Sequence, residues 1–310
     1  MTSRRQVLRV RRGENASSRL RVPTPLRLPT LGDMTATITR ELARLEEPRT
    51  LDDALRGIDQ VVDWAIEAES HIGYFAALYK RITLAIQDAI SEGVFDDGDR
   101  IDQLGVAFSR RYFNSLNAYF YPDEYQGLTL PWEVSFVGDR NHKAIMLQHM
   151  MAGLNAHITF DLGIATLAIA GNSLDKLADD FNRVNALLCS QIPGILDVVE
   201  QLSPDLRWTR RLIPNEVGIL KRMLTKLRHS AWLFAIDIAL HPDSAKRSRV
   251  NQAAWTAALG AWYLQPPARL TALPVLVRII AKRESRDVAG NIRALEGITN
   301  TPEKLNKAYL

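Results

Sequence analysis

The chain has 310 residues, 46% of them hydrophobic and 24% charged, which is typical of a globular protein with a sizeable core. Its single cysteine, Cys189, excludes a disulfide framework and a cysteine-based zinc site, and favours a reducing, cytoplasmic location. The formal net charge is +4, but eight arginines and only two acidic residues lie within residues 1–33, which leaves 31 basic and 33 acidic side chains in the remainder. The basic character therefore belongs to the N-terminal segment, and a nucleic-acid-binding domain is not indicated.

Residues 1–33 contain three prolines and no periodic apolar face, and they lack the apolar core of a secretory signal. This composition predicts a disordered extension, with Met34 as an alternative natural start; a phosphate-binding arm is the second interpretation. A single domain is expected over residues 34–310. No stretch approaches the roughly 18 uninterrupted apolar residues of a membrane span, so none is predicted.

The segment from Thr50 to Gly93 predicts two helices. Thr50 precedes a first turn that contains two aspartates, which is typical of a helix N-terminus. Apolar residues then recur every three or four positions, with a break at residues 70–73 and a second helix over residues 74–90. Gly93 predicts the end of that helix. A third helix is expected after the acidic residues 96–99, ending near residue 120.

Residues 121–141 carry two prolines and two glycines and predict one long loop, with LPWEVSF (residues 130–136) as a short extended piece. Helical patterns follow over residues 142–170, 172–202, 215–241 and 246–265. Pro193 predicts an interruption of the second of these, and the last 45 or so residues carry weaker helical patterns. The expected fold is all-α, a single bundle of about eight to ten helices.

The middle of the chain reads QHMMAGLNAHITFDLGIA (residues 148–165) and carries polar groups inside an apolar helical pattern. His149, Gly153, His157 and Asp161 are spaced by four, so they lie on one helical face, with about 6 Å of rise per step. Glycine inside a helix costs roughly 1 kcal/mol relative to alanine. Gly153 therefore indicates that a ligand or a neighbouring helix approaches the gap between the histidines.

His157 and Asp161 are direct neighbours on this face and allow two kinds of chemistry. They can share a metal ion, or they can form a carboxylate–imidazole couple for acid–base catalysis. A purely structural polar strut remains the third interpretation. His149 lies about 12 Å from His157 along the axis, too far to share one ion, so we expect it at the other end of the same cavity.

The stretch resembles the hallmark of a bacterial protein family of unknown function, Q-H-x3-G-x-N-A-H-I-x2-D-L, which falls on residues 148–162. Further matching stretches are GYFAALYKRIT, GVFDDGDRIDQLGVAFSRRYF, PWEVSF, DFNRVN and RHSAWLFA. The resemblance covers roughly residues 54–240 and implies no particular activity. Ser109 and Arg110 depart from the pattern.

The resemblance implies that twelve polar and aromatic residues form one set. They are Tyr74, Arg111, Tyr112, Trp132, His149, Asn155, His157, Asp161, Asp180, Asn185, Arg228 and Trp232. Asp180 can add a carboxylate to the His157/Asp161 site or lie on a helix surface. Arg111 and Arg228 lie in apolar-rich helices, where a guanidinium normally has an anionic partner, either a ligand or an internal carboxylate.

These residues favour an enzyme of specialised metabolism that acts on a small, largely apolar substrate within the bundle. His157, Asp161 and His149 would supply acid–base chemistry. An isomerase, cyclase or lyase fits best because no nucleophile is evident. Substrate contacts are expected from the following side chains: Arg228, Arg111, Tyr112, Trp132, Trp232, Asn155 and Asn185.

Two other functions stay open. One is a metal-dependent hydrolase with a divalent ion held by His157, Asp161 and Asp180, joined by His149. The other is a non-catalytic bundle that binds a hydrophobic ligand, with the polar residues as internal struts. The only partner indicated is a small molecule, and no oligomeric state is indicated.

Overall fold

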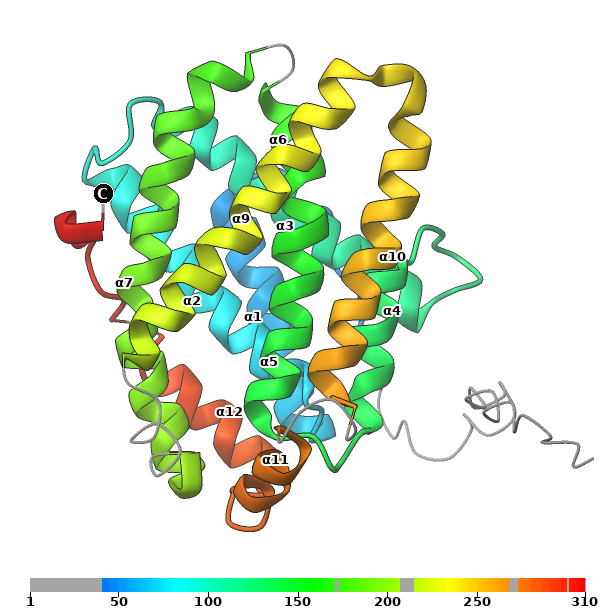
Figure 1. Cartoon of the computed structure of the whole chain (residues 1–310), viewed down its shortest axis with the longest axis vertical. Helices are drawn as coiled ribbons and strands as arrows, with labels where there is room; N and C mark the ends of the chain where they lie inside the picture. Colours follow the sequence, from blue (N-terminus) through cyan, green and yellow to red (C-terminus); the bar gives the residue numbers. More distant parts are fainter. Residues whose placement is uncertain (1–40, 171–172, 207–214, 268–272, 300, 310) are drawn as a thin grey trace, which may run out of the picture. The chain divides into compact units, whose positions relative to one another are not determined.

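The computed structural model describes residues 41–310 apart from 171–172, 207–214, 268–272, 300 and 310 (Figure 1). The predicted N-terminal extension lies outside the described residues, all of which belong to one compact unit. Within the described part, the regular structure is helical, with eleven α-helices and no strand. The predicted all-α class is confirmed. The helices are α1 (Leu51–Ala68), α2 (Ile72–Ser91), α3 (Gly98–Phe120), α4 (Leu130–Val137), α5 (Met146–Asn155), α6 (Leu162–Ala170), α7 (Ala178–Leu202), α9 (Glu216–Leu240), α10 (Ala245–Leu264), α11 (Leu273–Ala281) and α12 (Val288–Gly297).

The N-terminal helices begin and end where local chemistry predicts. The Thr50 hydroxyl accepts from the N–H of Asp53, and the Asp53 carboxylate accepts from the N–H of Thr50, so two otherwise unpaired donors are satisfied at the start of α1. Helix α2 ends before Gly93, whose φ of +70° lies in the left-handed region that favours glycine.

The centre of the bundle is the run from Met146 to Ala170, in which α5 and α6 are joined by a π-helical segment, Ala156–Asp161. The N–H of Leu162 donates to the carbonyl of His157, the five-residue spacing of a π turn. Figure 1 shows this run between α9 and α10, with the N-terminal helices behind it. His157 and Asp161 therefore stand at a local widening of the central helix, which the regular spacing by four did not reveal.

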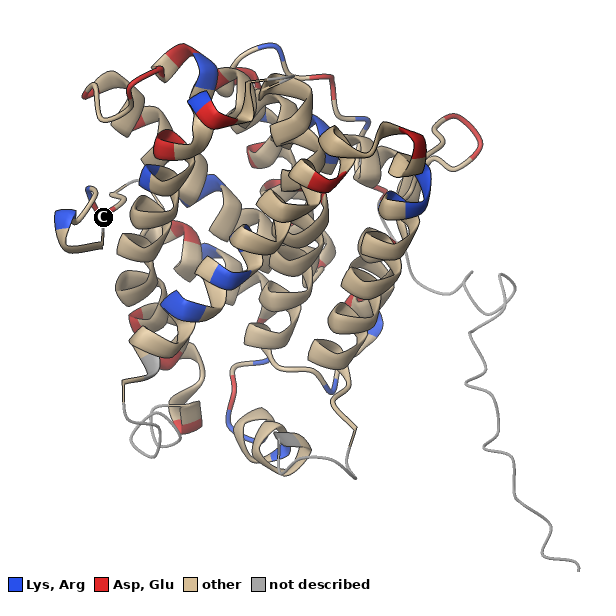
Figure 2. Cartoon of the chain, turned by 45° about the horizontal axis from the view of Figure 1, so that its top comes forward, with Lys and Arg blue, Asp and Glu red and all other residues tan. Residues whose placement is uncertain are grey.

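Asp161 is the only charged side chain in the central run, whereas Figure 2 shows acidic and basic residues interspersed over the outer helices. Among the described residues, Met146–Ala170 is long and apolar enough to cross a membrane by length and composition. However, 72% of its apolar window is buried inside the structure. Its apolarity is accounted for by its position in the core.

Two local predictions were wrong. LPWEVSF is not extended but forms α4, with Pro131 in the first turn, where the missing N–H has no helical partner to lose and the fixed φ suits a helix. Helix α7 continues through Pro193 without the predicted interruption, since buried residues on both sides of it, Leu188 and Leu196, hold the helix against the core. The long loop is therefore shorter than predicted, because α4 lies within it.

Helices approach the central run closely at its glycines. A Cβ at Gly163 would lie 2.7 Å from the carbonyl oxygen of Ala231 on α9, so any side chain there would push the two backbones apart. At Gly153 a Cβ would lie 2.6 Å from Cγ of Phe75 on α2. The sequence indicated that either a ligand or a neighbouring helix approaches the gap between His149 and His157. In the structure a neighbouring helix, α2, fills this gap with Phe75.

Candidate functional site

The site is built around the carboxylate of Asp161, which is fully buried at the end of the π segment. Its Oδ1 accepts from Nε of Arg111 at 2.7 Å, and its Oδ2 accepts from Nε1 of Trp132 at 2.6 Å. Nδ1 of His157 lies 3.4 Å from the same Oδ2. One carboxylate therefore joins α3, α4 and the central run.

This environment keeps Asp161 ionised. Burial acts to raise its pKa, but the Arg111 charge and the hydrogen bonds from His157 and Trp132 outweigh burial and hold the pKa below its ordinary value. Since the carboxylate oxygens can only accept, Nδ1 of His157 must carry the proton that points toward Oδ2. The lone pair of the neutral imidazole is then on Nε2.

The His157 ring is enclosed by aromatic side chains. It stacks on Phe108 with ring centroids 3.4 Å apart and an interplanar angle of 5°, and it meets Tyr79 edge-on at 4.6 Å. Burial lowers the pKa of His157, and the Arg111 charge acts in the same direction, whereas the hydrogen bond to Asp161 opposes them. His157 is therefore neutral at neutral pH, and within the described part of the chain its buried Nε2 has no hydrogen-bond partner.

His157 lines an apolar cavity of about 60 Å³, which we call the core cavity. Its other walls come from α2, α3, the central run, α7 and α9, and include Phe75, Tyr79, Leu154 and Arg228. A cavity of this kind needs about 10–15 Å³ per water molecule, so the core cavity has room for roughly four to six small non-hydrogen groups.

Arg228 is the cationic group of the core cavity. Its side chain is buried, its Nη2 donates to the carbonyl of Phe181 at 3.0 Å, and its guanidinium lies 4.2 Å over the Phe181 ring. Burial lowers the pKa of the guanidinium to about 9, which leaves it charged at neutral pH. In the described part of the chain no carboxylate pairs with it, and its buried Nε lacks a partner.

His149 lies on the other side of Phe75, which lines both the core cavity and a second cavity of about 10 Å³. The expectation that both histidines share one cavity is therefore not met by the geometry. His149 stacks on His71 with ring centroids 4.3 Å apart, and burial lowers the pKa of His149 to about 3, with the electrostatic effect of His71 acting in the same direction. Its Nε2 is buried, and no described residue hydrogen-bonds to it or to the buried hydroxyl of Tyr112 in the wall of the same cavity.

Four of the predicted site residues are engaged elsewhere. Asp180 accepts from the N–H groups of Asp96 and Asp97, at 2.8 and 2.9 Å, and so holds the turn before α3. Asn155 uses both ends of its amide, to the carbonyl of Thr256 and the hydroxyl of Thr159. The following pairs complete the account: Asn185 with Thr225, and Trp232 with Phe181.

These positions do not fit a bound divalent metal. Among the residues that the structure describes, no group of three or more His, Cys, Asp or Glu side chains is placed to hold an ion. The oxygens of Asp161 already accept from Arg111, Trp132 and His157, and Asp180 is bound to backbone N–H groups. The metal-ligand set expected from the sequence is thus not assembled.

The aromatic box around His157 was missed by sequence reasoning. Phe75, Tyr79 and Phe108 lie on α2 and α3, and their helical spacing looked like ordinary core. One signal was present. Ser109, a departure from the family pattern, is fully buried and bonds the hydroxyl of Tyr79 at 2.7 Å. The second departure, Arg110, pairs at the surface with Glu47.

The model of one protein family matches residues 51–267, well over half of the chain. That family, DUF5995, is described as a family of unknown function. No curated protein and no solved structure matches the chain. The chemistry of the core must therefore be argued from its own residues.

Proposed function

The chain belongs to the DUF5995 family, and from the geometry of its core we propose that it is an acid–base enzyme for a small, largely apolar substrate with one anionic group. His157 serves as the general base and Arg228 binds the anion. One observation carries the proposal: both side chains line the same apolar cavity, and each has a buried nitrogen for which the described residues provide no hydrogen-bond partner.

A structural role alone would be costly for this pair of groups. A buried polar atom without a partner costs about 1–3 kcal/mol, and more when the group is charged. Such atoms are rare in folded proteins and call for an explanation. A substrate carboxylate beside Arg228, with its transferable proton near Nε2 of His157, would satisfy both groups at once.

The proton transfer follows from the way Asp161 holds His157. Nε2 accepts a proton from the substrate, and the imidazolium that forms is stabilised by the Asp161 carboxylate through Nδ1–H. The imidazolium then donates a proton, either the one it accepted or one exchanged with solvent, to a different atom of the substrate or to a leaving group. The first outcome is an isomerisation and the second an elimination, and neither needs a nucleophile from the chain.

The size of the core cavity limits the substrate. A cavity of about 150 Å³ accommodates benzene, and the core cavity is less than half of that at about 60 Å³. An acid of about four to six non-hydrogen atoms fits this room in the conformation described. A metal-dependent hydrolase is not supported, because the donor set is missing.

The first experiment needs no substrate. Nitrogen-15 NMR of the histidine rings should show His157 as the neutral Nδ1–H tautomer at pH 7, with an unprotonated Nε2. His157→Gln identifies its signals, and His229→Gln, which removes an exposed histidine on α9, is the matched control. A protonated Nε2 at pH 7 would refute the assignment of His157 as a base.

The second experiment tests the reaction. The protein is incubated in D₂O with short-chain carboxylic acids and their enoic and 2-oxo analogues, and deuterium incorporation is followed by NMR. General-base catalysis contributes about 10²- to 10⁴-fold, so His157→Gln should lose at least a hundredfold of the exchange rate while His229→Gln keeps it. Arg228→Met should raise KM. Binding that depends on Arg228 without exchange of any probe would identify a non-catalytic ligand-binding bundle instead.

A further inference from the structure

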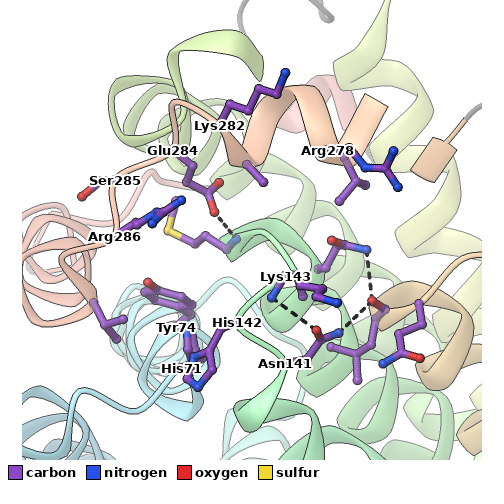
Figure 3. Close-up of a pocket in the computed structure, with 18 of the residues that line it drawn as sticks. His71, Tyr74, Asn141, His142, Lys143, Arg278, Lys282, Glu284, Ser285 and Arg286 are labelled. Carbon is purple, nitrogen blue, oxygen red and sulfur yellow. Dashed lines mark hydrogen bonds between the residues drawn. The ribbon is translucent and has the colours of Figure 1, made fainter. Parts of the chain in front are cut away.

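A second hollow lies on the surface of the bundle, outside the proposed active site. This open cleft of about 870 Å³ shares no lining residue with the core cavity. Figure 3 shows its walls, which come from the start of α2, the turn before α5, α11 and the segment that follows α11. We call it the basic cleft.

Cationic side chains outnumber acidic ones in the lining of the basic cleft. Lys143, Arg278, Lys282 and Arg286 face two acidic residues, Glu69 and Glu284. Glu284 is already engaged, because its carboxylate accepts from the N–H of Met146 at 2.7 Å and from the hydroxyl of Ser203. Within the described residues none of the four cations forms an ion pair.

A second open hollow on the same molecule provides a contrast. The hollow formed by residues 44–60 and part of α3 has four arginines in its walls, and three of them pair with acidic side chains of the described residues. The ion pairs there are Arg44 with Glu124, Arg56 with Asp53, and Arg110 with Glu47. Among the described residues, the basic cleft therefore leaves four cations without an ion pair, whereas this hollow leaves one, Arg49.

A rigid imidazole stands in the wall of the basic cleft. Asp139 accepts from the backbone N–H of His71 at 2.6 Å and lies 3.3 Å from its Nδ1. The ring stacks on that of His149, which is 6% exposed and whose Nε2 has no hydrogen-bond partner among the residues that the structure describes. Tyr74 meets His71 edge-on at 5.7 Å beside the cleft. The basic cleft therefore combines two side chains packed against the core, His71 and Tyr74, with exposed lysine and arginine side chains.

We propose that the basic cleft binds a small polyanionic molecule, either a phosphate ester or a polycarboxylate. Arg278 and Arg286 can each bind an anionic group through two parallel hydrogen bonds, and Lys143 adds a third charge. His71 and Tyr74 can hydrogen-bond the less charged part of the ligand. This site is independent of the proposed reaction at His157.

Isothermal titration with inorganic pyrophosphate and with citrate tests the proposal on the full-length protein at about 150 mM salt, where weak long-range attraction is screened. We expect saturable binding of at least one probe with a Kd below about 1 mM. The triple variant K143A/R278A/R286A should weaken it at least tenfold. A charge-matched control, R222A/K246A/R249A, removes three exposed cations from α9 and α10 and should leave Kd within about twofold.

The outcomes are distinct. Tighter binding of pyrophosphate assigns a phosphate ester, and tighter binding of citrate assigns a polycarboxylate. If neither probe binds below about 1 mM, or if the control variant loses as much affinity as the cleft variant, the proposal is overturned. Should the triple variant fail to fold, the single variant Arg286→Gln at an exposed position replaces it, and an unchanged Kd for that variant refutes the site. Loss of proton exchange in His157→Gln leaves this result unaffected.

Discussion

Replacing Gly153 by alanine tests how the core separates its two histidines. The new Cβ would lie 2.6 Å from Cγ and 2.8 Å from Cβ of Phe75, closer than carbon atoms pack. Phe75 is 4% exposed, and its ring is wedged against Tyr112 and Trp132, so it has little room to withdraw. Overpacking a core costs about 1–3 kcal/mol, while replacing a helical glycine by alanine returns up to about 1 kcal/mol.

The expected net result is a loss of about 1–2 kcal/mol in the free energy of unfolding. For a domain of this size that corresponds to a fall in Tm of roughly 2–8 °C. Gly260 on α10 provides the matched control, since a Cβ there would meet its nearest neighbours at 3.4 and 3.5 Å, an ordinary contact distance. Gly260→Ala should therefore stabilise the protein by up to about 1 kcal/mol.

Urea denaturation followed by far-UV circular dichroism measures both variants. A double-mutant cycle with Phe75→Leu localises the effect, because a smaller side chain should relieve at least about 0.5 kcal/mol of the cost of Gly153→Ala. The reasoning is refuted if Gly153→Ala stabilises the protein as much as Gly260→Ala, or if the cycle shows no coupling. Either result would mean that the position of the Phe75 ring does not require a glycine at residue 153.

Three further predictions concern the buried polar groups. Asp161→Asn leaves the guanidinium of Arg111 without its counter-charge and should cost about 3 kcal/mol in urea denaturation, near the lower end for a broken buried pair because Arg111 is partly exposed; a cost below about 0.5 kcal/mol would contradict the arrangement. Burial lowers the pKa of His149 to about 3, so as the pH falls the unfolded chain binds a proton at this residue before the folded protein does. The free energy of unfolding should therefore be highest above about pH 6.5 and should fall by roughly 1 kcal/mol per pH unit between pH 6 and 4. His149→Phe should flatten that slope, and an unchanged slope would show that His149 is protonated in the folded state. Asp180→Ala should lower the free energy of unfolding by about 2–3 kcal/mol, because the N–H groups of Asp96 and Asp97 lose their acceptor. Proton exchange that depends on His157 should not change. A loss of exchange at unchanged stability would place Asp180 in the active site instead.

The sequence alone determined the helical class and the face that carries His157 and Asp161. Both follow from short-range rules: apolar residues repeat with the helical period, Thr50 and Gly93 mark helix ends, and a spacing of four puts two side chains on one face. It also indicated, through the cost of Gly153, that something approaches the central helix closely. These features depend on neighbours within a turn or two of the chain.

Tertiary structure alone decided what each polar group does. Arg111 and Arg228 look alike in sequence, yet one pairs with Asp161 and the other faces a cavity without a carboxylate. Asp180 lies far from His157 in the chain, and packing places it at the turn before α3 and not at the central pair. The physical reason is that burial, ion pairing and cavity shape depend on which helices meet across the core. The residues that make such contacts can be far apart in the chain, as Tyr74 and Asn291 are at 217 positions.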